Sequence, residues 1–272
     1  AYRLFHGSVE GAPGLTVDRY GDLLLVQSFH TALAADELAE LEAFYATALP
    51  GLTAIYNDRS QGNSRIGNPL PPAQQAQAEA PREFRELGIH YLFQARHGGQ
   101  DPFLFLDLRA GRRRVLAEAA GKTVLNLFAY TCGVGLAAAK GGASHVVNVD
   151  FAESALKVGK HNARRNDLPI RLRFVHSDAF AAMRQLAGIG QPTMVRGKRM
   201  PAFPKLEPHR FDLVVLDPPR YAKSLFGVVD IVHDYAALMK LALLCTADGG
   251  TLLCCNNAAE LSREVWADQL ER

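Results

Sequence analysis

The chain has 272 residues, 48% of them hydrophobic and 21% charged, which is ordinary globular composition for one large domain with a smaller companion. No apolar run approaches the roughly 18 residues of a membrane span, and residues 1–14 lack the pattern of a secretion signal. The net charge of +2 is too small to indicate nucleic acid by itself. We therefore expect a soluble, cytoplasmic protein.

The cysteine content argues against disulfides and against zinc. The four cysteines are Cys132, Cys245, Cys254 and Cys255. None of them forms the CxxC pair that tetrahedral zinc sites use, and four cysteines in a chain of this length do not make a disulfide framework. We predict no metal site and a reducing compartment.

The first 75 residues are predicted to form a small α+β domain with a possible role in RNA binding. Strands are expected at residues 15–18, 23–29 and 53–56, and a helix at residues 35–48. Gly21 supplies the turn between the first two strands, and Pro50-Gly51 ends the helix. Residues 61–81 are rich in Gly, Asn, Pro and Gln and are predicted to be a linker.

The second domain, residues 76–272, is predicted to have an α/β fold with a Rossmann-like, doubly wound sheet. It opens with predicted strands at 89–95 and 103–106 and a helix at 110–119. The strands that follow are expected at 123–128, 146–149, 172–175, 211–216 and 251–255, and the helices at 134–140, 153–166, 179–186 and 234–244. This βα alternation is typical of a parallel sheet with helices on both faces.

Residues 188–210 interrupt the alternation with four prolines and a basic cluster, and they are predicted to be a long loop. The cluster consists of Arg196, Lys198, Arg199, Lys205, His209 and Arg210. A charge run of this kind is as typical of a solvated face as of a binding surface. Because the chain starts at Ala1 and not at Met, we expect that a further segment precedes it. Because only five parallel strands are predicted before a helix near Glu260, we also expect the chain to be truncated at its C-terminus.

Glycines and acids stand at the ends of four of these strands, where a parallel sheet binds its ligands. Gly133 and Gly135 follow the first strand, Asp150 the second and Asp178 the third, and Asp217-Pro218-Pro219 follows the fourth. A carboxylate after the second strand can accept hydrogen bonds from ribose hydroxyls. The glycines can instead be simple turn residues, and each of the two single acids can be a helix cap.

A nicotinamide dehydrogenase is a rival interpretation, since Gly133-x-Gly135-x-x-Ala138 formally fits the dinucleotide pattern. The dinucleotide turn is tight, whereas here Gly133 lies five positions after Phe128. The spacing therefore argues against a dehydrogenase.

Four segments together resemble the bacterial 23S rRNA large-subunit methyltransferases, which methylate C5 of cytosine or N7 of guanine. The segments are residues 14–22, 105–109, 126–131 and 217–219. The resemblance implies a class I methyltransferase fold and S-adenosyl-L-methionine as cofactor. An RNA-binding PUA domain, which often precedes this region in the family, is absent from the sequence.

The resemblance also implies which residues bind the cofactor. Phe128 and Tyr130 would line its pocket, Asp150 would hold the ribose and Asp178 the adenine. Asp217 would face the methyl group and the target base. The full predicted cofactor set is Phe105, Asp107, Arg109, Asn126, Phe128, Tyr130, Gly133, Asp150, Asp178 and Asp217, in which the first three would close the cofactor from above. Cys132 departs from the family, which more often has glycine at that place.

The residues after the last predicted strand bear on which atom is methylated. Methylating C5 of cytosine needs a cysteine thiolate that adds to the base, and the cytosine branch places it a few residues after this strand. Here that place holds Asn256-Asn257, which resembles the guanine-N7 branch, while Cys254 and Cys255 fall inside the apolar run. We predict Asp217, Asn256 and Asn257 as catalytic residues, with guanine N7 favoured over cytosine C5.

The predicted partner is RNA, and ribosomal RNA in particular. The base would be single-stranded or flipped out, stacked on Tyr221, with Arg220 and Lys223 on phosphate and Pro218-Pro219 shaping the loop. Two alternatives stay open: an RNA-binding module that keeps affinity for the cofactor without turnover, and a methyltransferase for a substrate other than RNA. The sequence does not distinguish a monomer from a homodimer.

Overall fold

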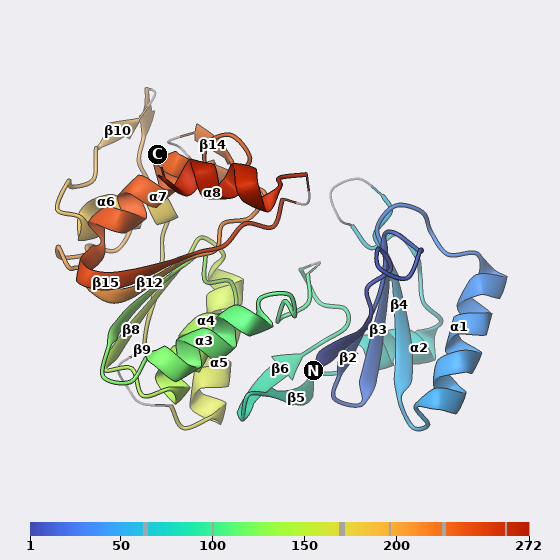
Figure 1. The fold of residues 1–272 in the computed structure, drawn as a ribbon. Coiled ribbons are helices and arrows are strands. Elements are labelled where there is room, and N and C mark those ends of the chain that lie inside the picture. Colours follow the sequence, from blue (N-terminus) through green and yellow to red (C-terminus); the bar gives the residue numbers. More distant parts are fainter. Residues whose placement is uncertain are drawn as a thin grey trace. The chain divides into compact units, whose positions relative to one another are not determined.

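The computed structural model describes residues 1–61, 65–99, 101–168, 172–195, 197–224, 227–258 and 260–271, apart from the side chains of 222–229. The chain forms two compact units, Ala1–Arg109 and Ala110–Arg272 (Figure 1). Residues 76–109 thus pack with the first unit. The division of function at residue 75 stays a prediction.

The first unit is built on a four-stranded sheet of order β1-β2-β3-β4. Its strands are β1 (Tyr2–Phe5), β2 (Leu15–Tyr20), β3 (Leu23–Ser28) and β4 (Thr53–Asp58). The first three pair antiparallel, and β3 pairs parallel with β4 because helix α1 (Ala35–Ala48) forms the crossover between them. Leu38, Leu41 and Tyr45 of α1 pack against one face of the sheet.

A hairpin and a short helix complete the first unit: β5 (Arg82–Glu86), β6 (Ile89–Phe93) and α2 (Pro72–Glu79). Tyr20 of β2 stacks on Phe93 with ring centroids 4.2 Å apart and meets the edge of Phe84 at 5.2 Å. Its hydroxyl donates to Leu104 O at 2.8 Å. Since side chains alternate along a strand, the hairpin covers the sheet face opposite to α1.

Two predictions for this unit are wrong, and two of its strands were not predicted. Helix α2 lies inside the predicted linker and begins at Pro72, because proline is tolerated in the first turn of a helix. Residues 103–106 are not a strand, although Phe103, Leu104 and Leu106 are buried, since an apolar run is also compatible with a buried bend. Strands β1 and β5 were not predicted.

The second unit contains a parallel sheet of five strands in the order β15-β12-β7-β8-β9. Its strands are β7 (Thr123–Leu127), β8 (His145–Asp150), β9 (Leu172–His176), β12 (Phe211–Leu216) and β15 (Thr246–Cys254). This arrangement confirms the predicted Rossmann-like α/β fold, which a smaller N-terminal sheet domain precedes in the sequence.

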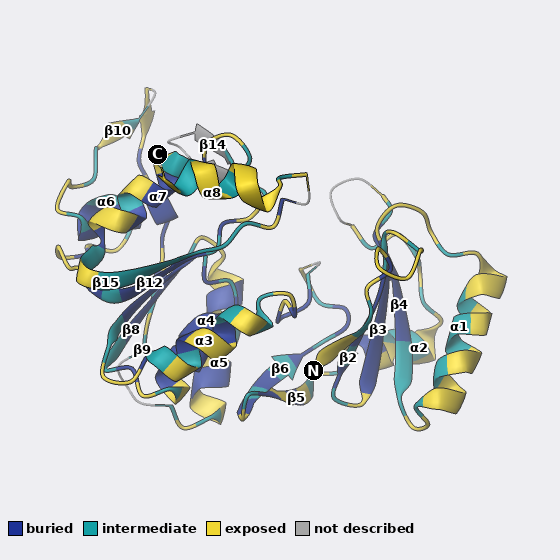
Figure 2. Ribbon diagram, viewed as in Figure 1, coloured by how far each residue is buried: buried dark blue, intermediate teal, exposed yellow. Residues whose placement is uncertain are grey.

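Helices cover both faces of this sheet (Figure 1). On one face lie α3 (Arg109–Glu118), α4 (Gly133–Lys140) and α5 (Glu153–Arg165), and on the other lie α6 (Ala179–Leu186), α7 (Tyr235–Leu244) and α8 (Arg263–Glu271). Figure 2 shows that α4 is buried over nearly its whole length, which is why its sequence is almost all Gly, Ala, Val and Leu. No helix among the described residues is long and apolar enough to cross a membrane.

Short strands appear in the second unit that periodicity did not predict. The predicted loop 188–210 contains a two-residue pairing of β10 (Met194–Val195) with β11 (Lys198–Arg199), and Arg196 of the basic cluster lies outside the described residues. A hairpin of β13 (Tyr221–Ser224) and β14 (Gly227–Asp230) follows the Asp-Pro-Pro segment. Strand β15 starts at Thr246, five residues before the prediction.

Candidate cofactor and substrate site

The strand order places a candidate site at the carboxyl ends of β7 and β12. From β7 the chain moves outward to β8 and β9, whereas β12 and β15 lie on the other side of β7. At such a reversal the connecting loops diverge and leave a crevice above the strand ends, where α/β sheets bind ligands. The residues that follow β7, β8, β12 and β15 are therefore the candidates.

The turn from β7 to α4 has an unusual backbone. Phe128, Tyr130 and Cys132 have φ angles of 55°, 47° and 64°, in the left-handed region that residues other than glycine rarely adopt. Strain of this kind concentrates at functional sites. Glycine would adopt the φ of Cys132 without strain.

Cys132 is fully buried, and its thiol packs closely against α5. A Cβ added at Gly159 of α5 would lie 2.7 Å from the Cys132 sulfur, so the thiol occupies the space that a larger residue at 159 would need. Burial raises the pKa of this thiol well above its ordinary value. Cys132 is thus a packing residue and not a nucleophile.

Asp150, at the end of β8, is tied to the turn after β7. Its Oδ2 accepts from Tyr130 N at 2.6 Å, and its Oδ1 accepts from Ala152 N at 2.7 Å. Burial raises the pKa of this carboxyl above its ordinary value of 3.8, and the two N–H groups oppose that shift. A carboxylate has about four acceptor positions, so it can accept further hydrogen bonds from a ligand.

Phe151, next to Asp150, is a candidate that the sequence analysis missed. Its side chain is 67% exposed, and its ring centroid lies 6.2 Å from that of His176 at the end of β9. A large exposed aromatic beside a strand-end acid is a signal for stacking on a planar ligand. The sequence shows the aromatic residue beside the acid, but only the structure shows that its side chain is exposed.

Asp178 caps helix α6 after β9. Its Oδ1 accepts from Phe180 N at 2.8 Å and from Ala181 N at 3.2 Å. The helix-cap interpretation of Asp178 therefore holds, and it does not exclude contact with an adenine, because a carboxylate has further acceptor positions.

Two predicted cofactor residues lie beneath the site. Asn126 of β7 is 2% exposed, and its amide donates to Asn148 Oδ1 at 2.9 Å. Gly133 is buried in the first turn of α4. Both residues are buried beneath the turn and support it from below.

At the end of β12, the segment Asp217-Pro218-Pro219 adjoins the end of β15. Cys255 N donates to Leu216 O at 2.9 Å, so the residues after both strands emerge side by side. Asp217 is half-buried, and the hydroxyl of Tyr235 donates to Leu216 O at 3.3 Å below it. The structure thus brings Asp217 and the segment after β15 to one place.

The side chains after β15 differ in their contacts. Asn256 Nδ2 donates to Ile231 O at 3.3 Å, and its Oδ1 accepts from Ala258 N at 2.9 Å, whereas Asn257 is exposed. Cys254 is half-buried in β15, and burial raises the pKa of its thiol. Among the described residues no three His, Cys, Asp or Glu side chains gather as metal ligands.

Beyond Pro219, an arginine lies over an aromatic ring. The guanidinium carbon of Arg220 is 5.1 Å from the ring centroid of Tyr221, which is 55% exposed, and Arg220 also forms an ion pair with Glu260. Lys223 lies in β13, but its side chain is outside the described part.

The remaining predicted residues belong to the first unit. Phe105 is 42% exposed, Asp107 Oδ1 accepts from Leu108 N at 2.9 Å, and Arg109 donates to Ala1 O at 3.3 Å. Their predicted closure over the cofactor stays a prediction.

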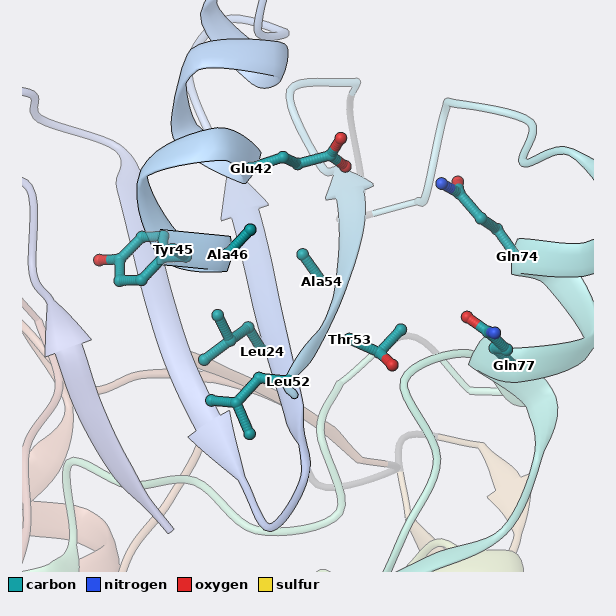
Figure 3. A pocket seen from close by; sticks show the side chains of 9 residues that line it. All are labelled: Leu24, Glu42, Tyr45, Ala46, Leu52, Thr53, Ala54, Gln74 and Gln77. Carbon is teal, nitrogen blue, oxygen red and sulfur yellow. The ribbon is translucent and has the colours of Figure 1, made fainter. Parts of the chain in front are cut away.

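The first unit also has a cavity of about 240 Å³ between α1 and α2 (Figure 3). Leu24, Leu52 and Ala54 form its apolar floor, and Glu42, Gln74 and Gln77 stand around it. None of the predicted site residues lines this cavity.

Comparisons with known proteins agree with this geometry. Residues 2–271 match the family model described as S-adenosylmethionine-dependent methyltransferase. The chain is 33% identical over 257 residues to ribosomal RNA large subunit methyltransferase I of Aeromonas salmonicida, covering 93% of this chain and 59% of the relative. With the protein of the same name from Escherichia coli strain SMS-3-5 it is 31% identical, covering 93% of this chain and 60% of the relative. The chain thus spans about three fifths of these relatives.

Two solved structures share the fold. The crystal structure of SMU.776 complexed with SAH matches with a TM-score of 0.79 and 26% identity, covering 99% of this chain and 64% of that one. The S-adenosylmethionine-dependent methyltransferase from Agrobacterium tumefaciens matches with a TM-score of 0.69 and 18% identity, covering 95% of this chain and 74% of that one. The second likeness concerns the fold alone.

The residues at the strand ends fit S-adenosylmethionine. Asp150 offers a carboxylate for hydroxyl groups, the strained turn brings backbone close to the crevice, and Phe151 offers an exposed ring. The family model covers nearly the whole chain, and a solved relative was determined with SAH, the product of the cofactor. The chain belongs to the family of S-adenosylmethionine-dependent methyltransferases.

Proposed function

We propose that the protein methylates a base of RNA, in 23S ribosomal RNA, and that N7 of guanine is favoured over C5 of cytosine. The relatives from Aeromonas salmonicida and Escherichia coli support an RNA substrate, since both are ribosomal RNA large subunit methyltransferases by name. The observation that carries the choice of atom is that Asn256 and Asn257 follow β15, where a cysteine would be needed for C5.

The turn after β7 and the end of β8 bind the cofactor in this proposal. S-adenosylmethionine, when bound, supplies an electrophilic methyl group. Asp150 accepts hydrogen bonds from its ribose hydroxyls, Phe128 and Tyr130 line its pocket, and Asp178 accepts from its adenine amino group. Phe151 stacks on the adenine ring.

The substrate base lies above the ends of β12 and β15. Asp217 and Asn257 hold its polar edge, and Asn256 keeps the loop in place through its bonds to Ile231 O and Ala258 N. N7 of guanine already has a lone pair, so the protein needs only to align it with the methyl group. The raised pKa of Cys254 supports this choice, because a thiol that stays protonated is a poor nucleophile.

The segment after Asp217 contacts the RNA chain. A base inside a helix cannot reach the site, so it enters unpaired or flipped and stacks on Tyr221, while Pro218-Pro219 stiffens the loop. Arg220 and Lys223 contact phosphate. Arg220 can do so when its ion pair with Glu260 opens, which costs little because both side chains are partly exposed to water.

The test is methyl transfer from radiolabelled S-adenosylmethionine to ribosomal RNA from cells that lack the enzyme. Borohydride and aniline cleave RNA at 7-methylguanosine, and bisulfite leaves 5-methylcytosine unconverted. Label in RNA with a new aniline cleavage site is the expected result. A bisulfite-resistant cytosine would move the target to C5.

Two other outcomes would support the alternatives. Binding of S-adenosylhomocysteine with no label in any RNA would favour a cofactor-binding RNA module without turnover. Label that resists nuclease and is removed by protease would point to a protein substrate.

A further inference from the structure

Two buried amides lie beneath the candidate cofactor turn. Asn126 of β7 and Asn148 of β8 are partners in the sheet register and are 2% and 0% exposed. Asn126 Nδ2 donates to Asn148 Oδ1 at 2.9 Å, and Asn148 Nδ2 donates to Arg173 O at 3.4 Å. Because a buried amide without partners is costly, these bonds fix the orientation of the Asn148 side chain.

Helix α4 rests on that side chain at Gly135. A Cβ added at Gly135 would lie 1.9 Å from Asn148 Oδ1 and 2.7 Å from its Cγ, which is far inside van der Waals contact. The first turn of α4 therefore lies so close to β8 that only glycine fits at position 135. The fixed amide sets the distance between the helix and the strand.

Strand β8 holds the same turn at its two next residues. Ala129 N donates to Val149 O at 2.9 Å, and Tyr130 N donates to Asp150 Oδ2 at 2.6 Å. Residues 148–150 thus contact both ends of the turn, its strained start and its helical end. A shift at Asn148 would move the helix start relative to Tyr130 and Asp150.

We propose that Asn148 is a positioning residue of the cofactor site. Together with Gly135 it sets the place of the turn from Phe128 to Gly133, and so the place of the backbone groups that meet the cofactor. Asn148 itself does not touch the cofactor. The inference rests on the proposed function, in which this turn binds S-adenosylmethionine.

The test is a double-mutant cycle with Gly135→Ala and Asn148→Ser, read by calorimetric titration with S-adenosylhomocysteine and by urea unfolding. Gly135→Ala pushes the turn away from β8, and we expect its Kd to rise by about tenfold or more, as small misplacements in a site do. Serine at 148 removes the clashing amide, and its small hydroxyl can turn to a rotamer that points away from the added Cβ. The double variant is therefore expected to bind within about threefold of the wild type, a non-additive rescue. Asn148→Ser alone loosens the turn and is expected to weaken binding by a few-fold.

Gly141→Ala is the matched control, because it perturbs the other end of the same helix. A Cβ at Gly141 would lie 2.2 Å from Leu116 O, so this variant is expected to lose stability while the folded protein keeps its Kd. Wild-type affinity in Gly135→Ala would overturn the inference, and so would a double variant that binds no better than Gly135→Ala. If Gly135→Ala alone does not fold, a double variant that folds and binds supports the inference, and one that fails to do so overturns it.

The proposed cofactor site is tested separately by the wild-type protein. Failure of the wild type to bind S-adenosylhomocysteine would contradict the proposed site itself, whatever the variants do.

Discussion

Asp150 connects the end of β8 with the strained turn after β7 through Tyr130 N. We predict that Asp150→Asn raises the Kd for S-adenosylhomocysteine by about 10- to 100-fold, since hydrogen bonds to a charged group contribute about 1.5–3 kcal/mol. The amide keeps the size of the side chain but loses the charge and one acceptor oxygen. Titration calorimetry measures the change. Asp248→Asn is the control, because the Asp248 side chain is 98% exposed and should leave the Kd unchanged.

The pKa of Asp150 predicts how binding depends on pH. Burial raises this pKa above 3.8, so affinity for S-adenosylhomocysteine should begin to fall at a higher pH than for an ordinary aspartate. In the window between 3.8 and the raised pKa, the folded state binds more protons than the unfolded state. The contribution of Asp150 to the free energy of unfolding therefore increases as the pH falls through that window. Binding and stability should thus change in opposite directions, and Asp150→Asn should abolish both effects.

The cysteines near the substrate site give a third prediction. If guanine N7 is the target, Cys254→Ala and Cys255→Ala should keep methyl transfer to RNA within about threefold, because no thiolate adds to the base. Asn257→Ala should reduce kcat/KM for RNA by about 10- to 100-fold, the effect of losing one well-placed hydrogen bond. Loss of transfer in Cys254→Ala with normal cofactor binding would instead identify a thiolate mechanism.

The sequence predicts the positions of some site residues but not their side-chain contacts. Asp150 and Asp217 were placed correctly at strand ends, because the mostly apolar runs 146–149 and 213–216 each end visibly at an acidic residue. The contact of Asn126 with Asn148 was not predictable, since pairing between strands far apart in sequence is a tertiary property. Phe151 was missed because the sequence shows an aromatic residue beside an acid but does not show that its side chain is exposed.

At the scale of elements, the sequence predicted best where the hydrophobic pattern is long and regular. Helix α1 and strand β12 have the predicted bounds, and the βα alternation gave the parallel sheet. Elements shorter than five residues were not predicted from the sequence, because so short a run shows no periodicity. Among them are β1 and the hairpin of β13 and β14. The course of residues 103–106 depends on packing by Tyr20, which no local pattern reveals.

The ion pair between Arg220, just before β13, and Glu260, just before α8, gives a fourth prediction. Glu260 pairs with Arg220, which is proposed to contact phosphate, so Glu260→Gln frees the guanidinium. We expect RNA to bind about 1.4- to fivefold more tightly, the range set by an exposed ion pair of about 0.2–1 kcal/mol. Filter binding at several salt concentrations measures it. Glu264→Gln, an exposed acid of α8, is the control, and equal effects of the two variants would mean that only net charge matters.

The whole molecule consists of two compact units with separate apolar cores, one around Val17 and Leu24 and one around Leu125 and Val214. We predict two transitions in calorimetric unfolding, of which S-adenosylhomocysteine raises only the one that belongs to residues 110–272. At a concentration of 100 times Kd the ligand stabilises the unit that binds it by about 2.7 kcal/mol. A single transition that shifts as a whole would mean that the two units unfold together.

The close packing of Cys132 against Gly159 also constrains how this sequence can evolve. Alanine at 159 would clash with the Cys132 sulfur. Glycine at 132 would relieve the strain of the left-handed backbone but would leave a void beside Leu156. Each single replacement is therefore disfavoured by the residue at the other position. The substitution Gly159→Ala is expected to be tolerated most easily in a sequence that already has glycine at 132. The two positions, 27 residues apart in helices α4 and α5 and their caps, are expected to be inherited as a pair.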